Sequence, residues 1–251
     1  MDRSQLFLDE VFLSLQGEGL EVGRPHLFVR LGGCPLRCNY CDTPRSWKQR
    51  EQFDVFFAHG STTRANPLSQ TDLHKVLEEV LASYDLKPAD VMLAVTGGEP
   101  LLQAEFLADW LPQWSGSVLL ETAGILALQL ESVISEVQLL SLDWKLPGTL
   151  RSGEELLATE ACLDVARAAK CTTQVKLVLT ETNSLEQVST ALKTIAEKLP
   201  ETVVFLQPVT LFANGPRPPK ADQLLTWSLH NRALPLDLRV LPQVHPLLGV
   251  R

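Results

Sequence analysis

The spacing of apolar residues changes along the chain, and each change predicts a different element. Two early segments, 6–15 and 26–31, are apolar and β-rich, which predicts two strands. Further on, apolar residues recur at the spacing of one helix face, at Leu73, Val76, Leu77, Val80 and Leu81. This spacing predicts a helix that packs its apolar face against a core.

Beyond residue 90, short apolar strands alternate with helical segments. We expect strands over 91–95, 118–121, 137–142, 173–179, 202–206 and 237–242. We expect helices over 101–113, 153–169 and 218–232, and one that begins with the capping box Asn183-x-x-Glu186. Strands separated by helices form βα units around a mainly parallel sheet. Around six units are visible, so the sequence predicts one α/β domain over 1–251, a partial (open) TIM-like (βα)6 barrel.

Residues 44–70 follow neither period. They are rich in Pro, Ser, Thr and charged residues. We therefore expect an irregular excursion from the core, inserted as a flap or a short element that covers a substrate.

Composition and charge narrow the class of protein. Of the 251 residues, 45% are hydrophobic and 21% charged, which is ordinary for a globular chain with a sizeable core. The net charge of −8 argues against a nucleic-acid surface, which normally carries a basic excess. No apolar run approaches the ~20 residues of a membrane span, and the first residues do not form a signal peptide. With unpaired cysteines, this favours a cytoplasmic location.

The segment 32–43, GGCPLRCNYCDT, holds three of the five cysteines. Cys34, Cys38 and Cys41 form a C-x3-C-x2-C pattern, and three thiolates on one loop suit a metal or an iron–sulfur cluster better than a disulfide. A structural zinc site would need a fourth Cys or His at close spacing, which the chain lacks there. A [4Fe–4S] cluster with one open iron is favoured, with zinc and three unrelated thiols as the alternatives.

A second motif, Thr96-Gly97-Gly98-Glu99-Pro100, follows the predicted strand 91–95. Polar residues at the carboxyl ends of parallel strands are typical of barrel active sites. The glycine pair permits close approach of the backbone to an amino group, and the Glu99 carboxylate can hold such a group. An ordinary turn before a helix is the alternative interpretation.

The cysteine pattern, with Tyr40 before its third cysteine, and the GGEP turn resemble the radical S-adenosylmethionine (SAM) superfamily. Within it, the chain resembles the 7-carboxy-7-deazaguanine synthase family of queuosine and 7-deazapurine biosynthesis. The resemblance covers nearly the whole chain. Its most specific parts are Glu10-x-Phe12-x-Ser14-Leu15-Gln16-Gly17-Glu18-Gly19, Phe28-Val29-Arg30-Leu31-x-Gly33-Cys34 and Cys41-Asp42-Thr43. The chain departs from the family pattern at Ala123 and Pro246.

The resemblance implies a fold, a reaction and cofactors. The fold would be the open barrel of radical SAM enzymes. A 5′-deoxyadenosyl radical would take a hydrogen atom from 6-carboxy-5,6,7,8-tetrahydropterin, and ring contraction with release of ammonia would give 7-carboxy-7-deazaguanine. The cofactors would be a [4Fe–4S] cluster, SAM and Mg²⁺. A glycyl-radical activating enzyme or another radical SAM enzyme is the nearer alternative, and a non-catalytic metal-binding protein is the distant one.

The resemblance also implies roles for particular residues. Cys34, Cys38 and Cys41 would bind the cluster, and Thr43 would bind Mg²⁺. The substrate would contact Leu15, Gln16, Gly17, Glu18, Arg30, Thr96, His245 and Arg251, with Arg30 pairing to the substrate carboxylate. SAM would contact Tyr40, Cys41, Asp42, Gly97, Gly98, Glu99, Glu121, Asp143, Trp144, Lys145 and Gln207. The expected partners are a flavodoxin- or ferredoxin-type electron donor and a second copy of the chain.

Overall fold

A computed structural model describes residues 4–150, 160–212 and 215–251. Ten strands form one sheet in the order β10-β9-β8-β7-β6-β5-β2-β1-β3-β4. The strands are β1 (Leu8–Leu15), β2 (Pro25–Leu31), β3 (Gln52–Phe57), β4 (Gly60–Ala65), β5 (Met92–Gly97), β6 (Val118–Thr122), β7 (Leu139–Trp144), β8 (Thr172–Leu179), β9 (Val203–Pro208) and β10 (Asp237–Val240). From β2 through β5 to β10 every neighbouring pair is parallel, whereas β1 runs antiparallel to β2.

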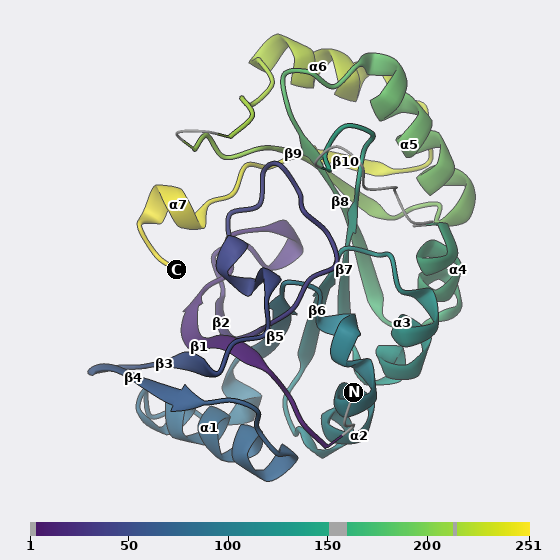
Figure 1. Ribbon diagram of the computed structural model, residues 1–251. Helices are drawn as coiled ribbons and strands as arrows, with labels where there is room; N and C mark the ends of the chain where they lie inside the picture. The colour runs from purple at the N-terminus through teal and green to yellow at the C-terminus, as the bar shows by residue number, and fades with distance from the viewer. Residues whose placement is uncertain (1–3, 151–159, 213–214) are drawn as a thin grey trace.

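Helices connect the parallel strands and cover one side of the sheet, except for the short last helix. They are α1 (Gln70–Ala82), α2 (Ala104–Trp110), α3 (Ala127–Val133), α4 (Glu160–Ala168), α5 (Leu185–Lys198), α6 (Ala221–His230) and the short α7 (His245–Leu248). Figure 1 shows α1 to α6 along the outer side of a curved sheet, with α7 on the other side. None of the described helices has both the length and the apolar character that a membrane crossing needs.

Along each strand, successive side chains point alternately to the apolar core and to a polar face of the sheet. On β2, Leu27, Val29 and Leu31 are buried in the main core, while Phe28 and Arg30 face a cavity on the other side. The same alternation continues across the parallel sheet, because successive side chains of a strand point to opposite faces. It turns polar side chains of these strands toward the inner side, among them Arg30, Thr96, Glu121, Asp143, Lys176 and Gln207.

The main course of the chain agrees with the sequence prediction. Each predicted strand is present, as are the predicted helices over 73–81 and 218–232, with bounds that shift by a few residues. The segment 101–113 is a run of 3-10 and α turns: Pro100–Gln103, α2 and Leu111–Gln113. Of the predicted helix 153–169, residues 160–168 form α4, and 151–159 lie outside the described residues.

Three expectations about elements need correction. Residues 52–65 are not irregular: β3 and β4 form an antiparallel hairpin, and β3 extends the sheet beside β1. Helix α3 was not expected. Helix α5 is capped by Ser184 and Gln187, not by Asn183 and Glu186: Ser184 Oγ accepts from the Gln187 amide at 3.1 Å. The structure is an α/β sheet with two open edges, β10 and β4.

Candidate active site

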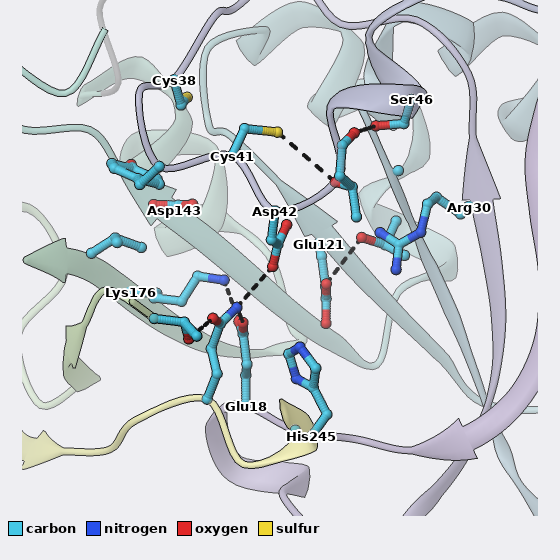
Figure 2. A pocket seen from close by; sticks show the side chains of 18 of the residues that line it. Glu18, Arg30, Cys38, Cys41, Asp42, Ser46, Glu121, Asp143, Lys176 and His245 are labelled. Carbon is cyan, nitrogen blue, oxygen red and sulfur yellow. Dashed lines mark hydrogen bonds and ion pairs between the residues drawn. The ribbon is translucent and has the colours of Figure 1, made fainter. Parts of the chain in front are cut away.

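A cavity of about 510 Å³ lies on the inner side of the sheet, at the carboxyl ends of its parallel strands. Its wall combines the cysteine loop, the turn after β1, strand ends of β2 and β5 to β9, and the C-terminal segment 243–251. Figure 2 shows Cys38 and Cys41 on one side of it and Glu18, Lys176 and His245 on the other. The fold thus gathers polar residues from both ends of the chain.

The cysteine loop supplies three soft donors to this cavity. Cys34, Cys38 and Cys41 are free thiols, all half-buried, and all line the cavity. Burial, with smaller contributions from Glu99 and the other two cysteines, raises the pKa of the Cys34 thiol to about 11, although a backbone hydrogen bond from Leu36 opposes the shift. Thiols that oppose one another's ionisation need a compensating cation, which an iron–sulfur cluster provides.

These donors share a loop and do not form a closed cage. In the part of the chain that the structure describes, no three His, Cys, Asp or Glu side chains are gathered as a metal ion's ligand set. The loop is nonetheless held in place: the Arg37 guanidinium donates to the Cys34 carbonyl at 2.8 Å, and the Asn39 amide donates to the Thr149 carbonyl at 2.9 Å. Donor chemistry, burial and a shared cavity fit a cluster on these three residues.

The glycine pair is required by packing against this loop. Gly97 has φ +144°, and a Cβ there would lie 2.3 Å from the Leu31 carbonyl oxygen. A Cβ on Gly98 would lie 2.3 Å from the Gly33 carbonyl oxygen and 2.8 Å from Cys34 Cβ. Gly97 therefore lets β5 pack against the end of β2, and Gly98 lets it touch the cysteine loop directly.

Two of the expected SAM contacts do not line the cavity. Glu99 is fully buried, and its carboxylate accepts bonds from the Leu101 amide, the Thr122 hydroxyl and the Ala123 amide at 2.7–3.0 Å. Burial raises the pKa of Glu99, and these three bonds oppose the shift. Trp144 packs against the main core.

Glu18 and Lys176 form a buried ion pair within the cavity wall. About 14% of the Glu18 side chain and 15% of the Lys176 side chain are exposed. Burial alone would raise the pKa of Glu18, but the Lys176 ammonium, with bonds from Lys176 and Gln243, lowers it to about 2. Burial disfavours the charged form of Lys176, yet Glu18 and two further carboxylates raise its pKa well above the usual range. Both groups remain charged at neutral pH.

A second carboxylate, Glu121, is held by two residues expected at the substrate. Gln16 Nε2 donates to its Oε1 at 2.9 Å, and the Thr96 hydroxyl donates to its Oε2 at 3.0 Å. Gln16 also accepts from the Glu18 amide at 3.2 Å, which fixes the turn after β1. The three side chains form one polar edge of the cavity.

Lys145 connects the end of β7 to the cysteine loop. Its ammonium lies 2.6 Å from Asp143 Oδ2 and 3.2 Å from the Tyr40 hydroxyl. Burial disfavours the charge of Lys145, but Asp143 and Tyr40 keep its pKa well above the usual range. The other Asp143 oxygen, Oδ1, and Gln207 Oε1 are buried acceptors without a protein partner among the described residues. Both can accept a hydrogen bond from a ligand.

The C-terminal segment closes the cavity beside the turn after β1. The Val244 amide donates to the Gly17 carbonyl at 2.9 Å, and His245 packs so closely on Gly17 that a Cβ there would lie 2.2 Å from Nδ1. Gln243 Nε2 donates to Glu18 at 2.7 Å and to Asp42 at 3.0 Å. His245 begins α7, beyond the end of β10 at Val240.

The structure brings nearly all of the expected residues together. All eight expected substrate contacts line the cavity, as do the three cysteines, Thr43 and every expected SAM contact except Glu99 and Trp144. Sequence reasoning gave no role to Glu10, Lys176 or Gln243, which also line it. Lys176 had a readable signal, since a charged residue inside an apolar strand is buried only with a partner.

Comparison with known proteins agrees with this geometry. A family model described as a 4Fe-4S single cluster domain matches residues 15–126. A 7-carboxy-7-deazaguanine synthase of Geobacter sulfurreducens is 30% identical over 96% of both chains. One of Methanopyrus kandleri is 33% identical over 95% of this chain and 91% of its own. The crystal structure of QueE from Escherichia coli has a TM-score of 0.58 and 22% identity over 94% of both chains, a likeness of fold.

The α/β sheet with a cysteine-lined cavity at its strand ends, together with these relatives, defines a radical SAM enzyme. Within that class, the identity to full-length relatives is decisive. The chain belongs to the 7-carboxy-7-deazaguanine synthase family.

Proposed function

We propose that this enzyme converts 6-carboxy-5,6,7,8-tetrahydropterin into 7-carboxy-7-deazaguanine with release of ammonia. The observation that carries the proposal is one cavity that joins the cysteine loop to Gln16, Glu18 and Arg30. A cysteine loop alone would support many radical SAM reactions. Arg30 offers a cation to a substrate carboxylate, and the Gln16 amide and the Glu18 carboxylate offer hydrogen bonds to the edge of a heterocycle. This combination supports a small carboxylated pterin as the substrate.

Each substrate-facing residue has a chemical role in this proposal. Arg30 pairs with the substrate carboxylate through its planar fork. The Gln16 amide and the Glu18 carboxylate complement the donors and acceptors of the aminopyrimidinone ring, with Leu15 and Gly17 alongside. Thr96, His245 and Arg251 complete the pocket. The hydrogen bonds of Gln16 with Glu121 and of Glu18 with Gln243 support this role, because they restrict both side chains.

The remaining residues serve the cofactors. Cys34, Cys38 and Cys41 hold the [4Fe–4S] cluster, and Thr43 supplies a hydroxyl to Mg²⁺ at the substrate carboxylate. SAM lies against Tyr40, Asp42, Gly97, Gly98, Asp143, Lys145 and Gln207. Glu121 and Cys41 lie close to SAM, and Glu99 and Trp144 support the residues that line the cavity without lining it themselves. When bound, cluster and SAM supply the 5′-deoxyadenosyl radical that starts the reaction.

The wider setting follows from the same proposal. The sheet acts as an open (βα)6 barrel that shields the reacting atoms from water. A flavodoxin- or ferredoxin-type protein supplies electrons, the enzyme works as a homodimer in the cytoplasm, and its product enters queuosine biosynthesis.

Replacement of Arg30 by Lys tests the proposed substrate. Lys keeps the charge and loses the bidentate fork, so we expect the KM for the pterin to rise at least about tenfold. Cleavage of SAM without the pterin should be unchanged, as measured by 5′-deoxyadenosine release under reducing, anaerobic conditions. As a control, Cys38→Ala should abolish both activities.

An equal loss of SAM cleavage in Arg30→Lys would contradict the assignment, because Arg30 would then support the cluster loop. An unchanged pterin KM would instead show that Arg30 does not bind the substrate carboxylate, whereas no turnover of the pterin by the unmodified enzyme would point to another substrate, as in a glycyl-radical activating enzyme.

A further inference from the structure

Glu10 joins two arginine side chains at one side of the cavity. On β1 it lies directly across from Arg30 on β2, and its Oε1 accepts a bond from Arg30 Nε at 2.9 Å. Its Oε2 accepts a bond from Arg251 Nη1 at 3.0 Å. Only 14% of the Glu10 side chain and 17% of the Arg30 side chain are exposed, so water screens the charge-assisted bond between them little, whereas the Arg251 side chain is 52% exposed.

The pairing register of β1 shifts between Leu8 and Glu10. Such an irregularity re-aims the side chains beside it. Asp9 bonds Arg45 at 2.8 Å, on the segment that follows the cysteine loop, and does not line the cavity. Glu10 does line it. The two adjacent carboxylates thus serve different partners.

The bond from Glu10 leaves the terminal amino groups of Arg30 free. Glu10 engages only Nε, and within the described ranges neither Nη1 nor Nη2 has a hydrogen-bond partner. The Arg30 guanidinium also lies over the Phe12 ring, with Cζ 5.8 Å from its centroid. A guanidinium held at Nε and over a ring has few orientations left. Its free fork remains available to a carboxylate in the cavity.

The second arm of Glu10 reaches the C-terminal segment. The Arg251 guanidinium stacks on Phe56 of β3, with Cζ 3.6 Å from the ring centroid. The main-chain oxygen of Arg251 accepts a hydrogen bond from the Ser14 hydroxyl at 2.9 Å. Glu10 therefore connects β2 to the segment 245–251, which also carries His245.

We propose that Glu10 is a positioning residue. It orients the free fork of Arg30 toward a carboxylate-bearing substrate, and it holds segment 245–251 against the cavity. This inference rests on the proposed function, in which Arg30 binds the substrate carboxylate.

The test compares Glu10→Gln with the unmodified enzyme, both with reconstituted cluster. Gln offers one oxygen and one amino group, so one of the two arginine bonds becomes a contact between two donors. We expect the pterin KM to rise about tenfold with kcat within about threefold, since a charge-assisted bond that acts on binding is lost. Hydrogen–deuterium exchange of the 245–250 amides should increase.

Two further variants exclude a general loss of structure. Asp164→Asn breaks the exposed pair with Lys198, 2.7 Å apart and remote from the cavity, and should leave both KM and exchange unchanged. Glu10→Asp keeps the charge with a shorter reach and should give an intermediate KM.

The outcomes separate this inference from the proposed function. A Glu10→Gln enzyme with KM and exchange like the unmodified one would overturn it. So would an equal loss of SAM cleavage without the pterin, because Glu10 would then support the cluster loop. If the unmodified enzyme forms no product, the proposed function fails. The hydrogen–deuterium exchange of the 245–250 amides in Glu10→Gln then decides whether Glu10 holds this segment.

Discussion

Lys176 and Glu18 show how one charge pair organises the substrate side of the cavity. Glu18 accepts bonds from Lys176, Gln207 and Gln243, which come from β8, from β9 and from the segment after β10. A carboxylate with three donors is fixed in orientation, and fixed orientation is what recognition of a heterocycle edge requires. The pair therefore links stability of the fold to the geometry of the site.

Replacement of Lys176 by Met should destabilise the enzyme by about 3 kcal/mol at pH 7, because Glu18 remains buried without its cation. The pKa of Glu18, about 2 in the intact pair, should rise in this variant. Since that pKa lies below its ordinary value of 4.5, the pair stabilises the fold fully above pH 4.5, and this contribution is lost as the pH falls toward 2. Anaerobic urea unfolding between pH 3 and pH 7 measures both effects.

The double variant Glu18→Gln with Lys176→Met is the control. It removes both charges, so it should be more stable at pH 7 than Lys176→Met alone. If the single variant loses no more stability than the double variant, burial of an unpaired Glu18 is not what destabilises it.

At the scale of elements, the end of β5 packs directly against the cysteine loop. Gly98 touches Gly33, Ser46 and Cys34, all of which belong to this loop or directly follow it. The loop position is thus set by backbone packing as well as by its own hydrogen bonds.

Gly98→Ala should lower the iron and sulfide content of the reconstituted enzyme to less than half. The added Cβ would lie 2.3 Å from the Gly33 carbonyl oxygen, so the loop that bears Cys34 must shift. Gly215→Ala is the matched control, since its nearest contact is 3.6 Å away. Full cluster content in Gly98→Ala would show that the loop tolerates this displacement.

The elements that the sequence predicts well are those in which apolar residues recur at a clear, regular spacing. Buried strands such as β5 and β7, and the amphipathic α1, carry this signal. The β3–β4 hairpin does not, because β4 (Gly60–Ala65) is exposed and polar and β3 packs through alternate residues only. Helix α3 has seven residues, too few to show a helical period. Segments that tertiary contacts stabilise give a weak local pattern.

The same division holds for the site. Cys34, Gly98 and Arg30 belong to dense local motifs, which is why their place in the cavity could be expected. Lys176 and Glu10 act through partners far away in the sequence, such as Glu18 and Arg251. Pairings of this kind depend on which strands become neighbours, and a single sequence does not reveal them.

At the scale of the whole molecule, the sheet brings an early and a late segment of the chain to one cavity. The segments 10–18 and 243–251 meet there, opposite the cysteine loop. In the proposed function, substrate recognition and cluster binding therefore occupy facing sides of the same space. This arrangement supports a reaction in which a radical formed at the cluster acts directly on a bound small molecule.

In the proposed reaction, this cavity turns a carboxylated pterin into a deazapurine. The most direct measurement is anaerobic incubation of the reconstituted enzyme with SAM, Mg²⁺, a strong reductant and 6-carboxy-5,6,7,8-tetrahydropterin, followed by mass spectrometry. We predict 7-carboxy-7-deazaguanine and ammonia in equal amounts. Release of 5′-deoxyadenosine from SAM with no change in the pterin would contradict the claim and leave a radical SAM enzyme with a different substrate.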